Sequence, residues 1–306
     1  MKRDKKYFSG LAALFLAAAS WGSGHAFVTS NLGVFSLQWL LVFRLGTAGL
    51  LLAILGFPKW KTATRADWKH GIVMGCIMYG IYFFFAQGVR FTATSRASFI
   101  VGAYIIFVPF VYILIRRKFP RLQDFAGTAL CLIGLGVILL DSSFGGINQG
   151  DLLVGVAALF YSFHVVVSAK FAKGADTFLL NMIQLCTCGC IALAVALLTA
   201  ELPRGLSLGD FSGPLYLAVV STVLPYMCSL YGQKYVRTTT SAVILSFESV
   251  FGCLSSIILL GEKISLRFVV GAIIVMLSFF VTEGLGSKKK EEAATEIGRA
   301  SCRERV

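Results

Sequence analysis

The chain has 306 residues, of which 57% are hydrophobic and 14% are charged, and its mean hydropathy is +0.79. Soluble globular domains carry about 25% charged residues, so this composition excludes an ordinary soluble protein. The formal net charge of +13 comes from Lys and Arg residues in short clusters between long apolar segments, which is typical of membrane-protein loops and argues against a nucleic-acid partner.

Ten segments are long and apolar enough to cross a lipid bilayer, which takes about 20 residues of helix. In chain order they are approximately 8–29, 34–56, 70–89, 96–115, 122–141, 151–170, 177–199, 213–233, 239–260 and 266–285. We therefore expect an all-α membrane protein with ten transmembrane helices.

The two ends of the chain differ in composition from the segments between them. The leader "MKRDKKYF" and the small apolar residues after it resemble a signal peptide. The apolar run continues through "WGSGHAFV" to a length that spans the bilayer, so we expect an uncleaved first helix. The tail 286–306 is polar, and its last part, "EIGRASCRERV", resembles translated linker or vector sequence.

Basic residues are distributed unequally between the two sets of connecting segments. With the N-terminus inside, the inner segments hold nineteen Lys and Arg residues and the outer loops hold five. Cytoplasmic loops carry such an excess of positive charge. We expect a multi-pass protein of the cell membrane, plasma or inner, with both termini in the cytoplasm.

The two halves of the sequence resemble each other. "GLAALF" at 10–15 recurs as "GVAALF" at 155–160, an offset of 145, and Gly127 matches Gly271 at an offset of 144. The segments "TATS" at 92–95 and "RTTTS" at 237–241 precede the fourth and ninth spans, where hydroxyl groups suit helix N-caps. Repeats at 8–141 and 151–285 would each hold five spans, an odd number, so the second must be inverted in the membrane.

Two charged residues lie at the middle of predicted spans, Arg44 in "SLQWLLVFRLGTAGLLLAIL" and Glu248 in the ninth. A charge at the bilayer centre costs about 2.5–3.5 kcal/mol on insertion scales, so it normally faces the bundle interior or a wet cavity and finds a partner. We expect both to line a central cavity, paired with each other or with a zwitterionic substrate. A purely structural ion pair that locks two helices is the alternative.

Aromatic, amide and imidazole side chains complete the predicted substrate-binding cavity. These residues are Trp21, Tyr79, Tyr82, Tyr104, Tyr161, His164, Gln184 and Tyr226. Aromatic faces stack on apolar ligand parts and attract cations. Glu248 and His164 are the candidates for proton coupling, because His titrates near neutral pH and a buried carboxyl group binds a proton more readily than an exposed one. Core packing is the alternative for each aromatic residue and each His.

The sequence predicts no enzyme, no metal site and no cofactor. In "CTCGC" at 186–190, a helix points Cys188 away from its two neighbours. Ser23 and His25 in "WGSGH" face different sides of one helix, whereas a nucleophile and its base must be in hydrogen-bond contact. The sequence contains no HExxH motif.

Several motifs together resemble the EamA domains of the drug/metabolite transporter superfamily. "WGSGHAFVTSNL" and "FRLGTAGLLL" resemble the start of a first EamA unit, and "RASFIVGAYIIFVPFVYILIRRKFPRLQDFAGTALCLIGLGVILL" its end. "GDLLVGVAALFYSFHVVVSAKFA" and "GQKYVRTTTSAVILSFESVFGCLSSIILLGEKISLRFVVGAIIVMLSFFV" are similar to the start and end of a second unit. The resemblance covers about residues 8 to 285.

The resemblance implies a ten-helix carrier made of two inverted five-helix EamA repeats, many relatives of which export amino acids or other small metabolites. Arg44 matches the family's arginine in the second helix, and Glu248 matches its glutamate in the ninth. The family often has Pro directly after that glutamate, whereas this chain has Ser249, which puts a bend of the ninth helix in question.

These features predict a secondary transporter that exports small metabolites by alternating access, with its cavity between the two repeats. Arg44 favours substrates with an anionic group and Glu248 those with a cationic group, so amino acids and related zwitterions fit both. Efflux of cationic or aromatic drugs is the second candidate, and an intramembrane enzyme is a remote one.

Overall fold

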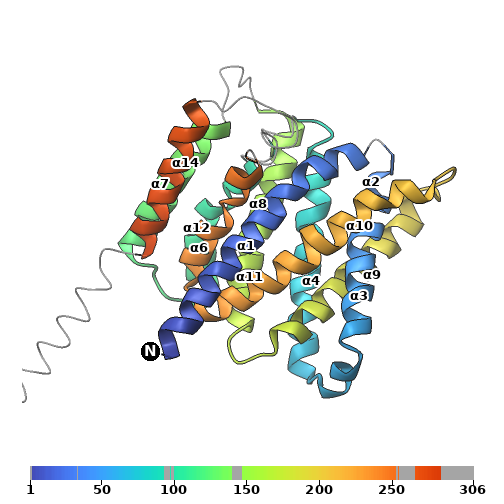
Figure 1. The fold of residues 1–306 in the computed structure, drawn as a ribbon, viewed down its shortest axis with the longest axis horizontal. Helices are drawn as coiled ribbons and strands as arrows, with labels where there is room; N and C mark the ends of the chain where they lie inside the picture. Colours follow the sequence, from blue (N-terminus) through green and yellow to red (C-terminus); the bar gives the residue numbers. More distant parts are fainter. Residues whose placement is uncertain are drawn as a thin grey trace, which may run out of the picture.

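The computed structural model describes residues 2–32, 34–92, 97, 100–139, 147–252, 254 and 266–283, and the regular secondary structure in these ranges is helical (Figure 1). The first half contains α1 (Lys2–Asn31), α2 (Leu37–Leu41), η1 (Val42–Gly46), α3 (Thr47–Leu55), η2 (Phe57–Thr62), α4 (Arg65–Gly88), α6 (Tyr104–Arg116) and α7 (Leu122–Leu139). The second half contains α8 (Gln149–Phe171), α9 (Thr177–Thr199), η3 (Leu208–Phe211), α10 (Ser212–Ala218), η4 (Val219–Val223), α11 (Leu224–Tyr235), α12 (Thr238–Leu245) and α14 (Leu266–Glu283).

The helices follow the predicted spans closely. Five continuous helical segments in the described ranges are long and apolar enough to cross a membrane: Leu37–Leu55, Arg65–Gly88, Gln149–Phe171, Thr177–Thr199 and Leu208–Tyr235. Shorter apolar helices occupy Ile100–Arg116, Leu122–Val137 and Val269–Thr282. The predicted ninth span beyond residue 254, the segment 93–95 of "TATS" and the tail 286–306 lie outside the described residues.

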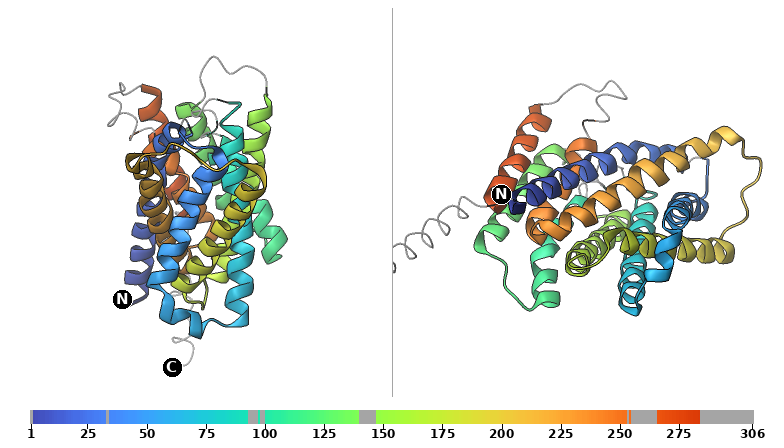
Figure 2. Two further views of the ribbon diagram at one scale, coloured as in Figure 1. Left: turned by 90° about the vertical axis from the view of Figure 1, so that its right-hand side faces the viewer. Right: turned by 60° about the horizontal axis from the view of Figure 1, so that its bottom comes forward.

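The last helices of the two halves, α7 and α14, pack side by side at one edge of the bundle (Figures 1 and 2). A Cβ atom on Gly127 would lie 1.9 Å from Thr282 Oγ1, and one on Gly134 would lie 2.7 Å from a methyl group of Val275. These contacts pair the start of α7 with the end of α14, so the two helices are antiparallel. Because α7 and α14 are equivalent in the repeat, the second half is inverted relative to the first.

The contact between α1 and α11 recurs, with the halves exchanged, between α8 and α4. A Cβ atom on Gly10 would lie 3.4 Å from the carbonyl oxygen of Gly232, and one on Gly88 would lie 2.9 Å from that of Gly150. Small residues at such crossings let membrane helices approach closely. Since α1 corresponds to α8 and α11 to α4, the bundle has an approximate two-fold symmetry.

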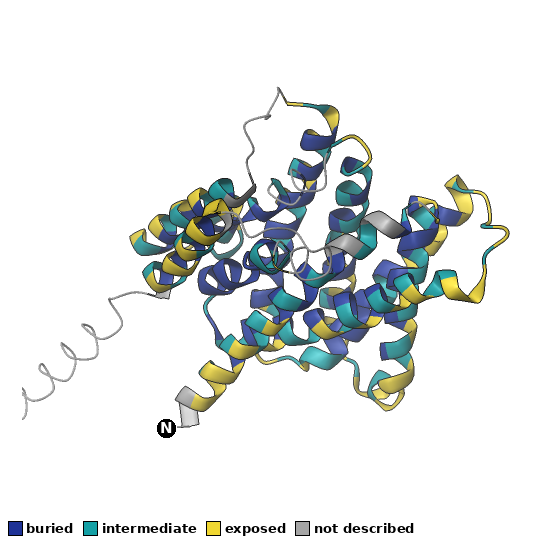
Figure 3. Cartoon of the chain, turned by 45° about the horizontal axis from the view of Figure 1, so that its top comes forward, coloured by how far each residue is buried: buried dark blue, intermediate teal, exposed yellow. Residues whose placement is uncertain are grey.

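Buried residues fill the centre of the bundle, and exposed residues cover its outer faces and connecting segments (Figure 3). Large apolar side chains on the outer faces are 55–67% exposed, including Leu50, Ile54, Leu114, Leu197 and Ile273. Soluble proteins rarely expose so much contiguous apolar surface. These faces therefore suit contact with lipid chains.

The ninth span is interrupted just before its glutamate. Helix α12 ends at Leu245, Ser246 and Phe247 form a turn, and the helix resumes at Glu248. The fourth span has the equivalent turn at Ala103, one residue before α6 begins. The bend that the missing proline put in question is thus present with Ser249 in its place.

The predicted hydroxyl cap at "RTTTS" is wrong. The N-cap residue of α12 is Arg237, and its side chain makes no capping hydrogen bond. The Thr239 hydroxyl instead donates to the carboxylate of Asp124, at 3.0 Å. The charged neighbour on α7 offers this hydroxyl a stronger, charge-assisted hydrogen bond than a backbone N–H group does.

Replacing Gly150 by Ala is expected to destabilise the protein by about 1–3 kcal/mol, the usual range for overpacking. The new Cβ atom would lie 2.7 Å from the carbonyl oxygen of Gly88 and 2.9 Å from the backbone nitrogen of Thr92, neither of which can rotate away. The matched control is Gly155→Ala on the same helix, where no neighbouring atom lies within 4 Å. Thermal unfolding in detergent should show a lower midpoint for the first variant and an equal or higher one for the second. Equal decreases would contradict this packing.

Candidate functional site

A cavity with about 760 Å³ of empty space, part of it open to solvent, lies between the two halves. Its wall is mainly apolar, with residues such as Leu37, Leu41, Ile81, Phe85 and Leu217. Six of the predicted site residues line it: Trp21, Arg44, Tyr82, Tyr161, Tyr226 and Glu248. A mostly apolar pocket with a few converging polar groups is the usual form of a small-molecule site.

Arg44 lies at the inner wall of this cavity and is 6% exposed. Its Nε donates to the Thr222 hydroxyl at 2.8 Å, and its Nη2 donates to the carbonyl and the hydroxyl of Ser221 at 2.9 and 3.2 Å. The ring of Tyr82 lies 4.5 Å from the guanidinium carbon, at cation–π distance. These acceptors are all neutral, so within the described residues the guanidinium is held in place without a counter-ion.

The backbone on both sides of the Arg44 contact is π-helical, at η1 and at η4. In η4 the hydroxyl of Thr222 donates to the carbonyl oxygen of Leu217, five residues earlier, at 2.8 Å. Single π-helical turns occur frequently at functional sites. Here they bring an arginine of the second span against two hydroxyls of the eighth.

Of the two predicted arrangements, the direct pair between Arg44 and Glu248 is not formed among the described residues. The hydrogen bonds of Arg44 go to Thr222, Ser221 and Tyr82, and no ion pair joins it to Glu248 within the described part of the chain. One carboxylate oxygen of Glu248 accepts from the Tyr161 hydroxyl at 3.3 Å. The cavity thus carries a cation and a carboxylate that are not joined to each other.

Aromatic rings separate these two charged groups. Trp21 packs edge-on against Tyr226, with ring centroids 5.0 Å apart, and against Tyr161, at 6.1 Å. The ring centroids of Tyr82 and Tyr226 lie 6.5 Å apart. A ligand between Arg44 and Glu248 would therefore contact aromatic faces along its length.

Four predicted residues lie behind the cavity wall rather than in it, and they are Tyr79, Tyr104, His164 and Gln184. Tyr104 stacks on Tyr161 at 4.2 Å, and its hydroxyl donates to the carbonyl oxygen of Ala242 at 2.8 Å. Tyr79 stacks on Phe83 at 5.8 Å.

His164 and Gln184 belong to a buried polar cluster next to the cavity. A ring nitrogen of His164 lies 3.0 Å from the Gln184 side-chain oxygen, and the amide of Gln184 donates to Asn181. Asn181 donates in turn to the backbone carbonyl of Tyr226 at 3.1 Å. Through Tyr226, the cluster is in contact with the cavity wall.

Sequence reasoning missed Ser221 and Thr222. Hydroxyl residues are common in membrane helices, so neither one stands out in the eighth span. The usable signal was indirect: an arginine within an apolar helix requires acceptors on a facing helix, but the sequence does not say which helix faces it.

Comparison with known proteins agrees with this architecture. Residues 8–140 and 148–283 match the EamA-like transporter family. An "Uncharacterized transporter" of Archaeoglobus fulgidus is 25% identical over 90% of this chain and 86% of its own length. A "Probable amino-acid metabolite efflux pump" of Salmonella typhimurium is 24% identical over 89% of this chain and 93% of its own length.

A solved crystal structure superposes with a TM-score of 0.75 and 16% identity, over 92% of this chain and 99% of the other, which shows the shared fold. The two family matches cover most of the chain, one in each half. The chain therefore belongs to the EamA-like transporter family and is a multi-pass membrane transporter with two EamA domains, not an enzyme.

Proposed function

We propose that this protein exports small zwitterionic metabolites, amino acids or close relatives, by alternating access. The observation that carries the proposal is the state of Arg44: a buried cation in the cavity wall, held only by neutral acceptors. Among the described residues its Nη1 makes no hydrogen bond. A substrate carboxylate would supply both the missing acceptor and the missing negative charge.

The opposite end of such a substrate meets Glu248. Its carboxylate lies in the same cavity, next to the rings of Trp21 and Tyr161. A substrate ammonium group would be attracted by this charge and by the faces of the rings. The Salmonella typhimurium relative described above carries a name of the same kind, an amino-acid metabolite efflux pump.

The position of the cavity supports an outward-facing state of the carrier. Its lining includes Val28, Leu37 and Ala86, which lie near the ends of their spans opposite the N-terminus (Figure 1). The positive charge of the connecting segments at the N-terminal end favours a cytoplasmic location for that end and for both termini. The cavity then lies in the outer half of a protein of the cell membrane.

Polar contacts between the two halves close the N-terminal end. Lys59 forms an ion pair with Asp176, and Arg237 forms a second pair with Asp124, at 2.5 Å. Burial raises the pKa of Asp176, but hydrogen bonds from Lys59 and two backbone N–H groups outweigh it and leave the pKa below its usual value. The first pair therefore stays charged at neutral pH, and these contacts would have to break for the substrate to enter from inside.

Efflux of cationic drugs is the second candidate, favoured by the carboxylate of Glu248 among aromatic rings. A purely cationic compound would also lie near the Arg44 guanidinium and be repelled by it. Proton coupling through Glu248 or His164 is compatible with either substrate class.

Transport by purified protein in sealed vesicles tests the proposal. Vesicles loaded with unlabelled substrate should exchange labelled zwitterionic amino acids in a protein-dependent way, and should exchange lipophilic cations or dicarboxylates much more slowly. Repeating the assay with an imposed pH gradient separates proton-driven from passive flux. Exchange of cations alone would overturn the zwitterion proposal in favour of drug efflux.

A further inference from the structure

A second cavity, with about 970 Å³ of empty space that is partly open to solvent, lies at the N-terminal end of the bundle, away from the central one. The segment after α6, the loop after α8 and the start of α12 surround it. Its lining consists of Tyr112, Arg116, Lys118, Phe119, Pro120, Arg121, Asp124, Lys173, Arg237, Thr238 and Thr239. Five basic side chains thus share the cavity with one carboxylate.

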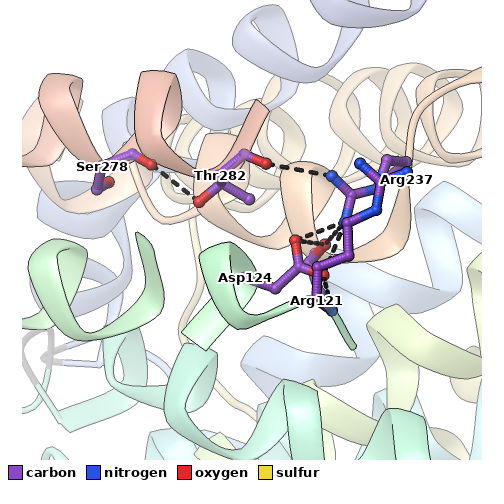
Figure 4. A network of polar contacts seen from close by, with 6 residues as sticks. Arg121, Asp124, Arg237, Ser278 and Thr282 are labelled. Atoms are coloured by element: carbon purple, nitrogen blue, oxygen red, sulfur yellow. Dashed lines mark hydrogen bonds and ion pairs between the residues drawn. The ribbon is translucent and has the colours of Figure 1, made fainter. Parts of the chain in front are cut away.

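That carboxylate already has its partners. Asp124 is 2% exposed, and its two oxygens accept from Arg237 at 2.5 and 2.7 Å, from the Thr239 hydroxyl and from the backbone N–H of Arg121 (Figure 4). A second nitrogen of Arg237 donates to the carbonyl of Thr282 at 3.1 Å. Asp124 therefore neutralises Arg237, and in the described structure the other four basic residues form no ion pair.

One of these four, Arg116, is half-buried and has an unused donor. Nη2 of Arg116 donates to the carbonyl oxygen of Ala169 at 3.2 Å. Nε of the same side chain is buried and has no acceptor in the part of the chain that the structure describes. A buried N–H group without a partner is costly and uncommon, and it points to an acceptor that is bound from outside the chain.

An apolar strip on the outer surface leads to the same cavity. Phe110 and Leu114 lie one helical turn apart on α6 and are 59% and 67% exposed. Beyond the end of this helix, Phe119 and Leu122 are each 86% exposed. The strip would contact acyl chains at the same place where the cavity offers positive charge.

We propose that this cavity binds the phosphate group of an anionic phospholipid. Arg116, Lys118, Arg121 and Lys173 supply the positive charge, and the unused Nε of Arg116 supplies a hydrogen-bond donor. Basic pockets between membrane helices bind anionic head groups in this way. Because Lys173 belongs to the second half and the other three to the first, the phosphate links the two halves at their closed end.

The test uses the full chain in lipid nanodiscs and does not depend on the identity of the transported substrate. The midpoint of thermal unfolding is compared in phosphatidylcholine alone, in phosphatidylcholine with phosphatidylglycerol, and in phosphatidylcholine with inorganic phosphate in the buffer. Phosphatidylglycerol should raise the midpoint by several degrees, and native mass spectrometry should find the lipid retained on the protein. An equal shift from inorganic phosphate would assign the site to the free ion rather than to a lipid.

Charge variants separate a specific site from general attraction to basic loops. Lys118 and Lys173 are exposed, so the double variant Lys118→Gln, Lys173→Gln should fold, and it should lose the shift and the retained lipid. The control Lys61→Gln, Arg65→Gln removes the same charge from η2 and from the first residue of α4, at the same end of the bundle, and should keep both the shift and the retained lipid. Equal losses in the two variants, or no shift in the unmodified protein, would overturn the proposal.

Discussion

Replacing Arg44 by Ala lowers the rate of zwitterion exchange in vesicles by roughly 10- to 150-fold. A hydrogen bond to a charged group contributes about 1.5–3 kcal/mol, and each 1.4 kcal/mol corresponds to about a factor of ten. The proposed substrate carboxylate has its closest donor in Arg44, so its loss leaves that end of the ligand without a partner. Initial exchange rates at several substrate concentrations measure the effect.

Two further variants make the Arg44 result specific. Arg44→Lys keeps the charge but cannot bond Thr222, Ser221 and a substrate with the geometry of a guanidinium, so an intermediate rate is expected. Arg204→Ala removes an exposed arginine from the loop between α9 and η3 and should leave the rate unchanged. If folded Arg44→Ala protein exchanges substrate at the original rate, Arg44 does not bind the substrate.

Replacing Glu248 by Gln is expected to reduce zwitterion exchange by about tenfold or more, because a charged partner of the ammonium group is lost. The substitution keeps the shape of the side chain and an oxygen that can accept from the Tyr161 hydroxyl, so the fold should survive. The control Glu201→Gln changes an exposed acid in the loop between α9 and η3. Exchange and proton-driven uptake are measured in parallel.

The two assays assign different roles to Glu248. Loss of both activities supports an ammonium-binding carboxylate. Loss of proton-driven uptake with normal exchange would mean that Glu248 carries protons and does not bind substrate. Normal values in both assays would remove Glu248 from the site, whatever the result at Arg44.

The number of spans and their inverted arrangement were predictable because hydrocarbon thickness fixes the length of a span, and an odd number of spans inverts a repeat. The placement of Arg44 and Glu248 in one cavity followed from the cost of burying a charge in lipid. These predictions rest on the large free-energy cost of placing polar or charged groups in lipid, which acts on each segment separately. They hold without knowledge of how the helices pack.

Pairwise contacts between helices were not predictable in the same way. The hydroxyls that hold Arg44 and the turn before Glu248 depend on the rotation of helices that are far apart in sequence. Hydroxyl residues can bond either to local backbone groups or to charged groups of distant helices. Thr239 shows the ambiguity, since its position suggested a helix cap and its hydroxyl in fact bonds Asp124.

The ion pair between Asp124 and Arg237 has a consequence for biosynthesis. Asp124 is nearly completely buried, and its counter-ion is added to the growing chain 113 residues later. Likewise, Ser221 and Thr222, which accept hydrogen bonds from Arg44, emerge from the ribosome long after Arg44 does. A nascent first domain would thus hold an unmatched guanidinium within the bilayer and an unmatched carboxylate at the end of a span, so folding of the first domain depends on contacts that the second domain supplies.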